Sequence, residues 1–294
     1  MKVKIAQIQH SCSKDIDENH KKVLEFIEEA GSKGANIVCT QELYKTQYFC
    51  QVEDWDNFKY AEVIDENNQT IKDLSKLAEK YQLIIIASLF ERRAKGVYHN
   101  TAVVIDTHGK LIGKYRKMHI PDDPHFYEKF YFTEGDLGYQ VFKTKYGNIG
   151  VLICWDQWFP EAARLTALKG ADMIFYPTAI GWLPEEKEEF GKSQYNAWET
   201  VQRGHSVANG CFVITTNRVG FENTPDGNGG IEFWGQSFIT NTYGEILNKA
   251  SVNREEILLT EVDLREIEET RKVWPFFRDR RVCSYNDLTK KWLD

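Results

Sequence analysis

The internal repetition of this chain limits its possible folds more than any other feature. Residues 34–42 (GANIVCTQE) resemble residues 170–178 (GADMIFYPT) at an offset of 136, and residues 104–114 resemble residues 239–249 at an offset of 135. Two matches in the same order, at nearly one offset, predict two structurally similar halves. Each half would contain helix, strand, helix and strand, followed by a hairpin. Chance similarity between two ordinary hairpins is the alternative interpretation.

Apolar residues recur with strand and helix periods along the whole length, which indicates an α/β protein. The patterns predict strands at 3–9, 36–41, 83–89, 148–154, 172–176, 211–216 and 237–241. They predict helices at 20–30, 71–81, 159–168 and 194–208, and a helical tail from Leu264. We expect two facing sheets covered outside by helices, with a site where strand ends meet. Because no linker rich in Pro, Gly or Ser divides the halves, residues 1–294 are predicted to form a single domain.

Composition and charge argue against several classes of function. With 37 basic and 44 acidic residues the net charge is −7, and apart from a short cluster at residues 278–281 there is no dense basic patch. No nucleic-acid partner is therefore expected. The longest apolar run, residues 83–89, is too short to cross a bilayer, and the N-terminus lacks the apolar segment of a signal peptide. We expect no membrane partner.

The cysteine spacing is typical of a reducing compartment. Six cysteines are scattered without a CxxC pair, which disfavours zinc ribbons and disulfide frameworks and favours a cytoplasmic location. Residues 220–230 are rich in glycine but lack the GK[ST] ending of a phosphate-binding loop, and are interpreted as a flexible loop. No metal-ligand spacing stands out, so no metal and no cofactor are expected.

One cysteine occupies a position suited to chemistry. Cys154 ends the strand predicted at 148–154, and a helix with Pro160 in its first turn follows within a few residues. A side chain on such a turn projects into the crevice at the end of a strand, where sites of α/β proteins lie. The helix N-terminus and a nearby cation are expected to lower the thiol pKa and so to produce a nucleophilic thiolate. A buried small apolar residue is the alternative interpretation.

A thiol nucleophile needs a base and an electrophilic group. None of the seven histidines has an acid placed as in a Cys–His protease, which leaves a carboxylate as the candidate base. Glu42 follows the strand at 36–41, where a polar residue at a buried strand end would be costly without a role. Lys117 lies in a basic stretch beyond the hairpin at 104–114. A capping or surface glutamate and a solvated basic cluster are the alternatives.

Three motifs together resemble those of the nitrilase superfamily of carbon–nitrogen hydrolases. They are residues 41–43 (QEL), residues 115–119 (YRKMH) and residues 153–161 (ICWDQWFPE), in the order and spacing of that superfamily. The resemblance extends from the N-terminal strand to about Asn241. It implies a four-layer αββα sandwich with two pseudo-symmetric halves, whose subunits pair across the sheets.

The same resemblance implies roles for four residues. Cys154 corresponds to the nucleophile, Glu42 to the general base and Lys117 to the group that stabilises the tetrahedral intermediate. Glu128, in a stretch crowded with aromatic residues, corresponds to a second glutamate that helps to position substrate and Lys117. A non-catalytic binding protein of the same fold is the alternative, and the presence of all three catalytic residue types counts against it.

The resemblance also extends to a substrate class. Four segments are similar to the branch of the superfamily that hydrolyses N-carbamoylputrescine to putrescine, carbon dioxide and ammonia, namely 119–124, 127–133, 154–161 and 176–181. His125 departs from the pattern of that branch, which commonly has glycine there. Hydrolysis of N-carbamoyl-β-alanine, as by β-ureidopropionase, is the alternative, and a nitrilase or other amidase comes third.

Physical chemistry distinguishes these substrates by charge. The terminal ammonium of a carbamoyl amine is attracted to carboxylates and aromatic faces, and the candidate contacts are Tyr48, Trp155, Asp122 and Glu185. A solvated helix start is the alternative for Glu185. A carbamoyl amino acid would need a basic partner for its carboxylate, for which Arg218 is the nearest candidate.

The C-terminal tail, from about residue 264 to 294, is helical at first and then aromatic and basic. Its segment 274–281 (WPFFRDRR) is too apolar for the exposed end of a monomer. We interpret it as packing on another subunit, as tails of the superfamily do, in a homo-oligomer built from dimers.

Overall fold

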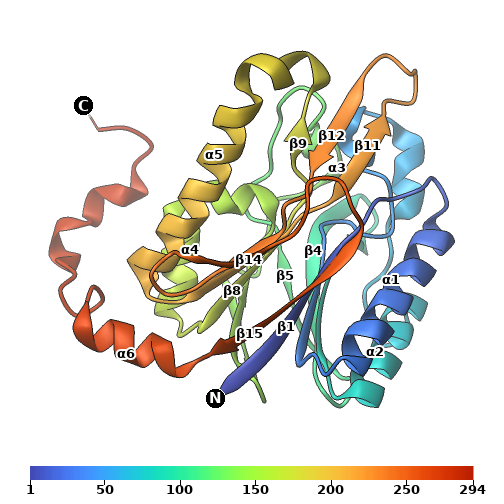
Figure 1. Cartoon of the computed structure of the whole chain (residues 1–294). Helices are drawn as coiled ribbons and strands as arrows, with labels where there is room; N and C mark the ends of the chain where they lie inside the picture. Colours follow the sequence, from blue (N-terminus) through green and yellow to red (C-terminus); the bar gives the residue numbers. More distant parts are fainter. Residues whose placement is uncertain (294) are drawn as a thin grey trace.

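The computed structural model describes residues 1–293, which contain two six-stranded sheets (Figure 1). The first sheet has the strand order β15-β1-β2-β3-β4-β5. Its strands are β1 (Lys2–Gln9), β2 (Ile37–Thr40), β3 (Ile84–Ala94), β4 (Val97–Ile105), β5 (Leu111–Arg116) and β15 (Glu256–Asp263). The three strands β1, β2 and β3 run parallel, and the other three pair antiparallel with their neighbours.

The second sheet has the order β14-β13-β10-β8-β7-β6. Its strands are β6 (Gln140–Thr144), β7 (Gly147–Val151), β8 (Met173–Pro177), β10 (Phe212–Thr216), β13 (Phe238–Thr240) and β14 (Ile246–Lys249). Here β7, β8 and β10 run parallel, and β6, β13 and β14 pair antiparallel.

The two sheets therefore have the same topology. Starting from β15 or from β6, each has one antiparallel edge strand, three parallel strands and an antiparallel hairpin. The repeated sequences occupy equivalent places, since 34–42 contains β2 and 170–178 contains β8, while the second pair of repeats covers the hairpins β4–β5 and β13–β14. The prediction of two pseudo-symmetric halves is confirmed.

Alternating side chains build the layers. Along β3, Ile84 and Ile86 join the core between the two sheets, whereas Ile85 and Ala87 join the core beneath the outer helices. Helices α1 (Ile16–Ser32) and α2 (Gln69–Tyr81) cover the first sheet, and α4 (Pro160–Leu168) and α5 (Pro184–Asn209) cover the second (Figure 1). This is the predicted four-layer αββα sandwich.

The prediction of a flexible loop at 220–230 is wrong. Residues in this stretch form a hairpin of β11 (Val219–Asn223) and β12 (Gly230–Trp234), and β9 (Gly181–Trp182) pairs with β12 to make a third, small sheet. The glycine-rich composition of the stretch led to the prediction of a loop. In the structure only the connecting turn at 224–229 is irregular. This small sheet matters for function because it lies beside the site described below.

Element ends differ from the predictions at two places near that site. Helix α5 begins at Pro184, ten residues earlier than predicted. The prediction missed its first turns because they are exposed and carry charged residues without an apolar period. Strand β7 ends at Val151 rather than at Cys154. Ile153 keeps an extended backbone but lies outside the sheet ladder, which frees the chain to turn.

After α6 (Arg265–Val273), the residues 274–293 form two short 3₁₀ turns and extend away from the sheets (Figure 1). Large apolar side chains are exposed along this tail, with Trp292 at 83%, and the others include Trp274, Phe276, Val282 and Leu288. Phe277 is different, since the guanidinium groups of Arg164 and Arg271 lie over its ring. Within residues 1–293, no helix combines the length and apolarity needed to span a membrane.

Candidate active site

Cys154 lies on a sharp turn between a strand and a helix. It opens a 3₁₀ turn (Cys154–Trp158) that leads into α4, and its φ of 42° lies in the left-handed region. Residues other than glycine rarely adopt this backbone conformation, and the strain that it causes persists only where the surroundings impose it. Cys154 is 5% exposed, and its thiol faces the carbonyl oxygen of Ala179 at 3.9 Å. The backbone therefore holds the sulfur at one position.

Asp156 fixes this turn from beneath. Its buried carboxylate accepts hydrogen bonds from the backbone N–H of Ile153 at 2.9 Å and from the hydroxyl of Tyr115 at 2.7 Å. The second oxygen of Asp156 accepts a hydrogen bond from the backbone N–H of His119 at 3.0 Å and lies 2.7 Å from Nδ1 of the His119 ring. The residue before Cys154 is thus tied to β5 and to the segment that follows it.

Lys117, Glu42 and Glu128 form a buried charged triad. Nζ of Lys117 lies 2.8 Å from Oε1 of Glu42, and 2.9 and 2.7 Å from the two carboxylate oxygens of Glu128. All three side chains are 0% exposed. Glu42 follows β2, Lys117 follows β5, and Glu128 begins the short helix α3 (Glu128–Tyr131). Segments far apart in the sequence therefore meet at one edge of the first sheet.

One oxygen of Glu42 remains free to act. Oε1 also accepts a hydrogen bond from the side-chain amide of Asn100 at 2.7 Å, whereas the buried Oε2 has no hydrogen-bond partner among residues 1–293. The backbone N–H of Glu42 donates to the carbonyl oxygen of Thr178, whose neighbour Ala179 faces the Cys154 thiol. The segment after β2 is thus joined to the segment after β8 that faces the sulfur, and the charge of Glu42 acts on the thiol.

The pKa values of Lys117 and Glu128 follow from burial and neighbouring charge. Burial alone would lower the pKa of Lys117, but the carboxylates of Glu128 and Glu42 outweigh it and raise that pKa well above its usual value. Burial, with the charge of Glu42, raises the pKa of Glu128 to about 7 against the opposing effect of Lys117. The lysine therefore stays cationic at any pH that the protein would meet.

The expectation of a low thiol pKa is wrong. Burial, together with the negative charge of Glu42, raises the pKa of Cys154 well above its usual value, and Lys117 offsets this only in part. The resting side chain is consequently a thiol. For such a thiol to act as a nucleophile, a neighbouring base would have to remove its proton during attack.

A cavity of about 340 Å³ opens onto the thiol. Cys154 and Glu128 lie at its buried end, and aromatic residues form much of its wall, among them Phe126, Trp155, Trp158 and Trp234. Toward solvent the lining includes Asp123 and Glu186. The side-chain amide of Gln194 donates to one Glu186 oxygen at 3.0 Å. The lining contains no Lys or Arg drawn from the described residues.

The predicted contacts are divided between this cavity and its surroundings. Trp155 lines the cavity, and Tyr48 lies behind it, donating its hydroxyl hydrogen bond to Glu128 at 2.6 Å. Asp122 and Glu185 are exposed and do not line the cavity; their sequence neighbours Asp123 and Glu186 do. On α5 each residue is rotated by about 100° from the next, so only Glu186 turns inward.

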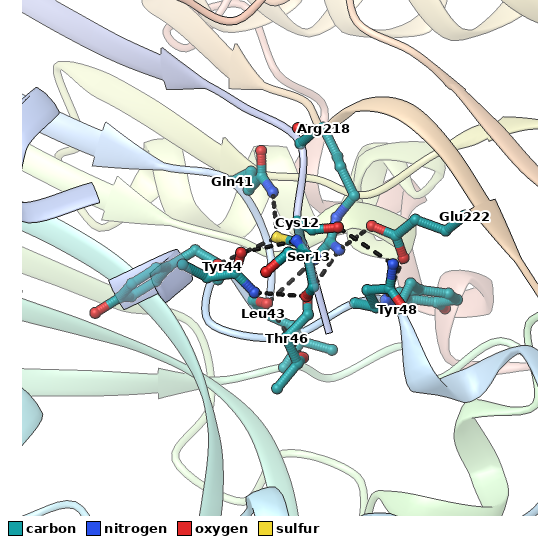
Figure 2. A network of polar contacts seen from close by, with 12 residues as sticks. Cys12, Ser13, Gln41, Leu43, Tyr44, Thr46, Tyr48, Arg218 and Glu222 are labelled. Atoms are coloured by element: carbon teal, nitrogen blue, oxygen red, sulfur yellow. Dashed lines mark hydrogen bonds and ion pairs between the residues drawn. The ribbon is translucent and has the colours of Figure 1, made fainter. Parts of the chain in front are cut away.

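Arg218 does not face the cavity. Its guanidinium is fully buried and donates to Glu222 at 2.6 Å and to backbone carbonyl oxygens of the segment after β2 (Figure 2). It therefore cannot meet the carboxylate of a ligand in this conformation. The structure explains His125 as well, because its φ of 62° lies where glycine is favoured.

Sequence reasoning missed several residues that shape the site. Asn100, Asp156 and Gln194 each bind a charged or reactive part of the site, and no motif distinguishes Asn100 or Gln194. Asp156 alone lay within a recognised segment, 153–161. In residues 1–293 no three His, Cys, Asp or Glu side chains are grouped so as to hold a metal ion.

Comparison with known proteins agrees with this fold and site. The family model of carbon–nitrogen hydrolases matches residues 2–272, so the chain belongs to that family and is an amide-hydrolysing enzyme. It is 44% identical to an N-carbamoylputrescine amidase of Oryza sativa subsp. japonica over 98% of this chain and 94% of the relative. It is 39% identical to a citrullinase of Francisella tularensis, covering 99% of each.

A solved structure shows the same architecture. The crystal structure of a carbon–nitrogen hydrolase from Helicobacter pylori superposes with a TM-score of 0.95, at 49% identity over 100% of both chains. At this identity the likeness extends beyond the fold to the family of carbon–nitrogen hydrolases.

The electrostatics of the thiol can be tested with Glu42→Gln. Removing the negative charge beside the sulfur while Lys117 remains should lower the Cys154 pKa, because the thiolate is then less disfavoured. Thiolate absorbance near 240 nm against pH, corrected with Cys154→Ala, measures this pKa. Glu185→Gln, an exposed glutamate outside the cavity, is the matched control and should leave it unchanged. An unchanged or raised thiol pKa in Glu42→Gln would contradict the arrangement.

Proposed function

We propose that this enzyme hydrolyses N-carbamoylputrescine to putrescine, carbon dioxide and ammonia, a step of polyamine biosynthesis. The observation that carries the proposal is a cavity with acidic side chains toward solvent and with the Cys154 thiol and Glu128 at its inner end. Glu128 is bonded to the buried ammonium of Lys117, which in turn binds Glu42. The named relative from rice supports the same substrate.

Cys154, Glu42 and Lys117 would carry the first half of the reaction. Oε2 of Glu42 takes the thiol proton as sulfur attacks the carbamoyl carbon. The oxyanion that forms is stabilised by Nζ of Lys117 and by the backbone N–H that follows Cys154. Collapse of this intermediate breaks the bond to the terminal nitrogen, which leaves as ammonia with the proton held by Glu42.

The second half regenerates the thiol. Glu42 activates a water molecule, which attacks the S-carbamoyl carbon and releases the cysteine sulfur, which regains its proton. The product, an N-substituted carbamate, loses carbon dioxide to give putrescine. Glu128 takes no proton in this scheme. Its role is to hold Lys117, to which both of its oxygens are bonded, and so to orient the cation toward the oxyanion.

The charge of the outer cavity supports an amine substrate. Asp123 and Glu186 would attract the distal ammonium, and the aromatic wall would contact the methylene chain. Citrulline, the substrate named for the relative from Francisella, differs from N-carbamoylputrescine by one carboxylate on the carbon that bears the amine. Without a basic residue in the lining, that carboxylate would face acidic side chains unpaired. The same argument disfavours N-carbamoyl-β-alanine, since Arg218 is engaged elsewhere.

Ammonia release from N-carbamoylputrescine, citrulline and N-carbamoyl-β-alanine tests the proposal. We expect kcat/KM for N-carbamoylputrescine to exceed the other two by about 100-fold or more, since an unpaired carboxylate near two acids costs on the order of 3 kcal/mol. Cys154→Ala should abolish all turnover. A preference for either carboxylated substrate would refute the substrate, and turnover that survives in Cys154→Ala would refute the mechanism.

Neighbouring acids in the sequence provide an internal control for the ammonium contact. Glu186→Gln should raise KM for N-carbamoylputrescine by roughly tenfold or more with little change in kcat, because it removes binding that is equal in ground and transition states. Glu185→Gln, one residue away on the exposed face of α5, should leave both constants within about twofold. Equal effects from the two variants would mean that Glu186 does not contact the substrate.

We propose also that residues 1–294 act as one catalytic domain, that copies assemble through the C-terminal tail into a homo-oligomer built from dimers, and that the protein is cytoplasmic. The exposed apolar side chains of residues 274–293 support a subunit contact, because their exposure to water in a monomer would be unfavourable. All six cysteines are free, in keeping with a reducing compartment.

Light scattering on the full chain and on a chain ending at Val273 tests the assembly. We expect the truncated protein to form an assembly with fewer subunits, because the apolar surface that joins subunits is lost. Trp292→Ser should weaken assembly, whereas Trp55→Ser, a substitution of another exposed tryptophan far along the chain, should not. An unchanged number of subunits after truncation would exclude the tail as the subunit contact.

A further inference from the structure

A buried ion pair outside the cavity is connected to the triad through hydrogen bonds. Arg218 follows β10 and Glu222 lies in β11, and Nη1 of the arginine is 2.6 Å from Oε1 of the glutamate. Their side chains are 0% and 2% exposed. Neither residue touches the cavity, and the mechanism above uses neither. Figure 2 shows the pair beside the segment that leads from β2 to Tyr48.

Arg218 grips the backbone that carries the proposed general base. Nη2 donates to the carbonyl oxygen of Glu42 at 2.9 Å. Figure 2 shows the guanidinium beside Leu43 and Thr46, whose carbonyl oxygens accept from Nη2 at 3.1 Å and from Nη1 at 2.8 Å. Leu43 has a φ of 48°, a left-handed conformation that a leucine adopts only when its surroundings hold it there. The planar guanidinium spans these acceptors with a geometry that an ammonium cannot reproduce.

Glu222 connects the same pair to the other carboxylate of the triad. Its Oε2 accepts the backbone N–H of Tyr48 at 2.5 Å, and the Tyr48 hydroxyl donates to Oε1 of Glu128 at 2.6 Å. Glu128 in turn binds Lys117. The contacts therefore close into a ring that runs from Arg218 through Glu42, the lysine and Glu128 to Tyr48 and back through Glu222.

Stability alone does not explain a fully buried ion pair. Removing two charges from water is costly, and apolar residues of similar volume often serve a core equally well. The positions of the bonded groups are more informative, because every main-chain group that these two side chains bind belongs to residues 42–48. That segment holds Glu42 at one end and Tyr48 at the other.

We propose that Arg218 and Glu222 are positioning residues for the reaction, which set where Glu42 and Glu128 stand around Lys117. The proposal rests on the roles given above to Glu42 and Lys117. It assigns to the small sheet of β9, β11 and β12 a second task, since that sheet also supplies Trp234 and Gly181 to the cavity. Substrate pocket and general base are thereby held by one structural unit.

Kinetics of Arg218→Lys and Glu222→Gln on N-carbamoylputrescine test the proposal. Displacing a catalytic group by about an ångström can cost on the order of 100-fold in rate, so we expect kcat to fall by at least about tenfold with KM within about threefold. Arg218→Lys keeps the positive charge but loses the fork. A loss of kcat in this variant shows that geometry matters, beyond charge.

Glu91→Gln is the matched control. Glu91 forms another buried ion pair, with Arg116 at 2.8 Å, but it binds no part of residues 42–48. We expect it to lower the urea midpoint of unfolding as much as Glu222→Gln does, while kcat stays within about twofold. If Glu222→Gln fails to fold, Glu222→Asp, which keeps the charge on a shorter side chain, gives the same kinetic test.

The outcomes separate this proposal from the proposed function. Inactive wild-type protein, or activity that survives in Cys154→Ala, would refute the function itself. An active wild type with kcat retained in folded Arg218→Lys and Glu222→Gln or Glu222→Asp would overturn the positioning role. Loss of kcat in Glu91→Gln equal to that in Glu222→Gln would also overturn it, because the effect would then follow stability alone.

Discussion

The buried ammonium of Lys117 is the constraint on which the rest of the structure depends. A cation removed from water is tolerable only when opposite charges and hydrogen-bond acceptors surround it, and here Glu42 and Glu128 supply them. Two carboxylates so close together need that cation in return. The three charges therefore stabilise one another as a unit, and each must be held by rigid structure around it.

The fold provides that rigidity by repetition. Two sheets of identical topology face each other, so the strand ends of both halves converge at one edge. One half contributes Glu42 after β2 and Lys117 after β5, and the other contributes Cys154 after β7. The proposed nucleophile and its proposed base therefore come from different sheets, each shortly after a strand.

The raised thiol pKa changes how the nucleophile is understood. Sequence position alone suggested a thiolate stabilised by a helix and a cation, whereas the neighbouring carboxylate and the burial favour the neutral thiol. A buried cysteine that is a neutral thiol at rest is less reactive toward adventitious electrophiles than a thiolate. In the proposed mechanism, the carboxylate that disfavours the thiolate at rest is also the group that accepts the thiol proton during attack.

The sequence by itself determined the fold class and the two related halves, because hydrophobic period and repetition can be read along the chain. Its motifs indicated the residues of the triad and the thiol through their resemblance to the nitrilase superfamily. Only the tertiary structure decided which acid faces the cavity, since residues 185 and 186 are both glutamates and differ only in their direction on α5. It also decided that Arg218 clamps a backbone segment rather than meeting a ligand, and that the hairpin at 219–234 is ordered. Burial, pKa and side-chain direction depend on residues far apart in the chain, and a linear pattern does not contain those distances.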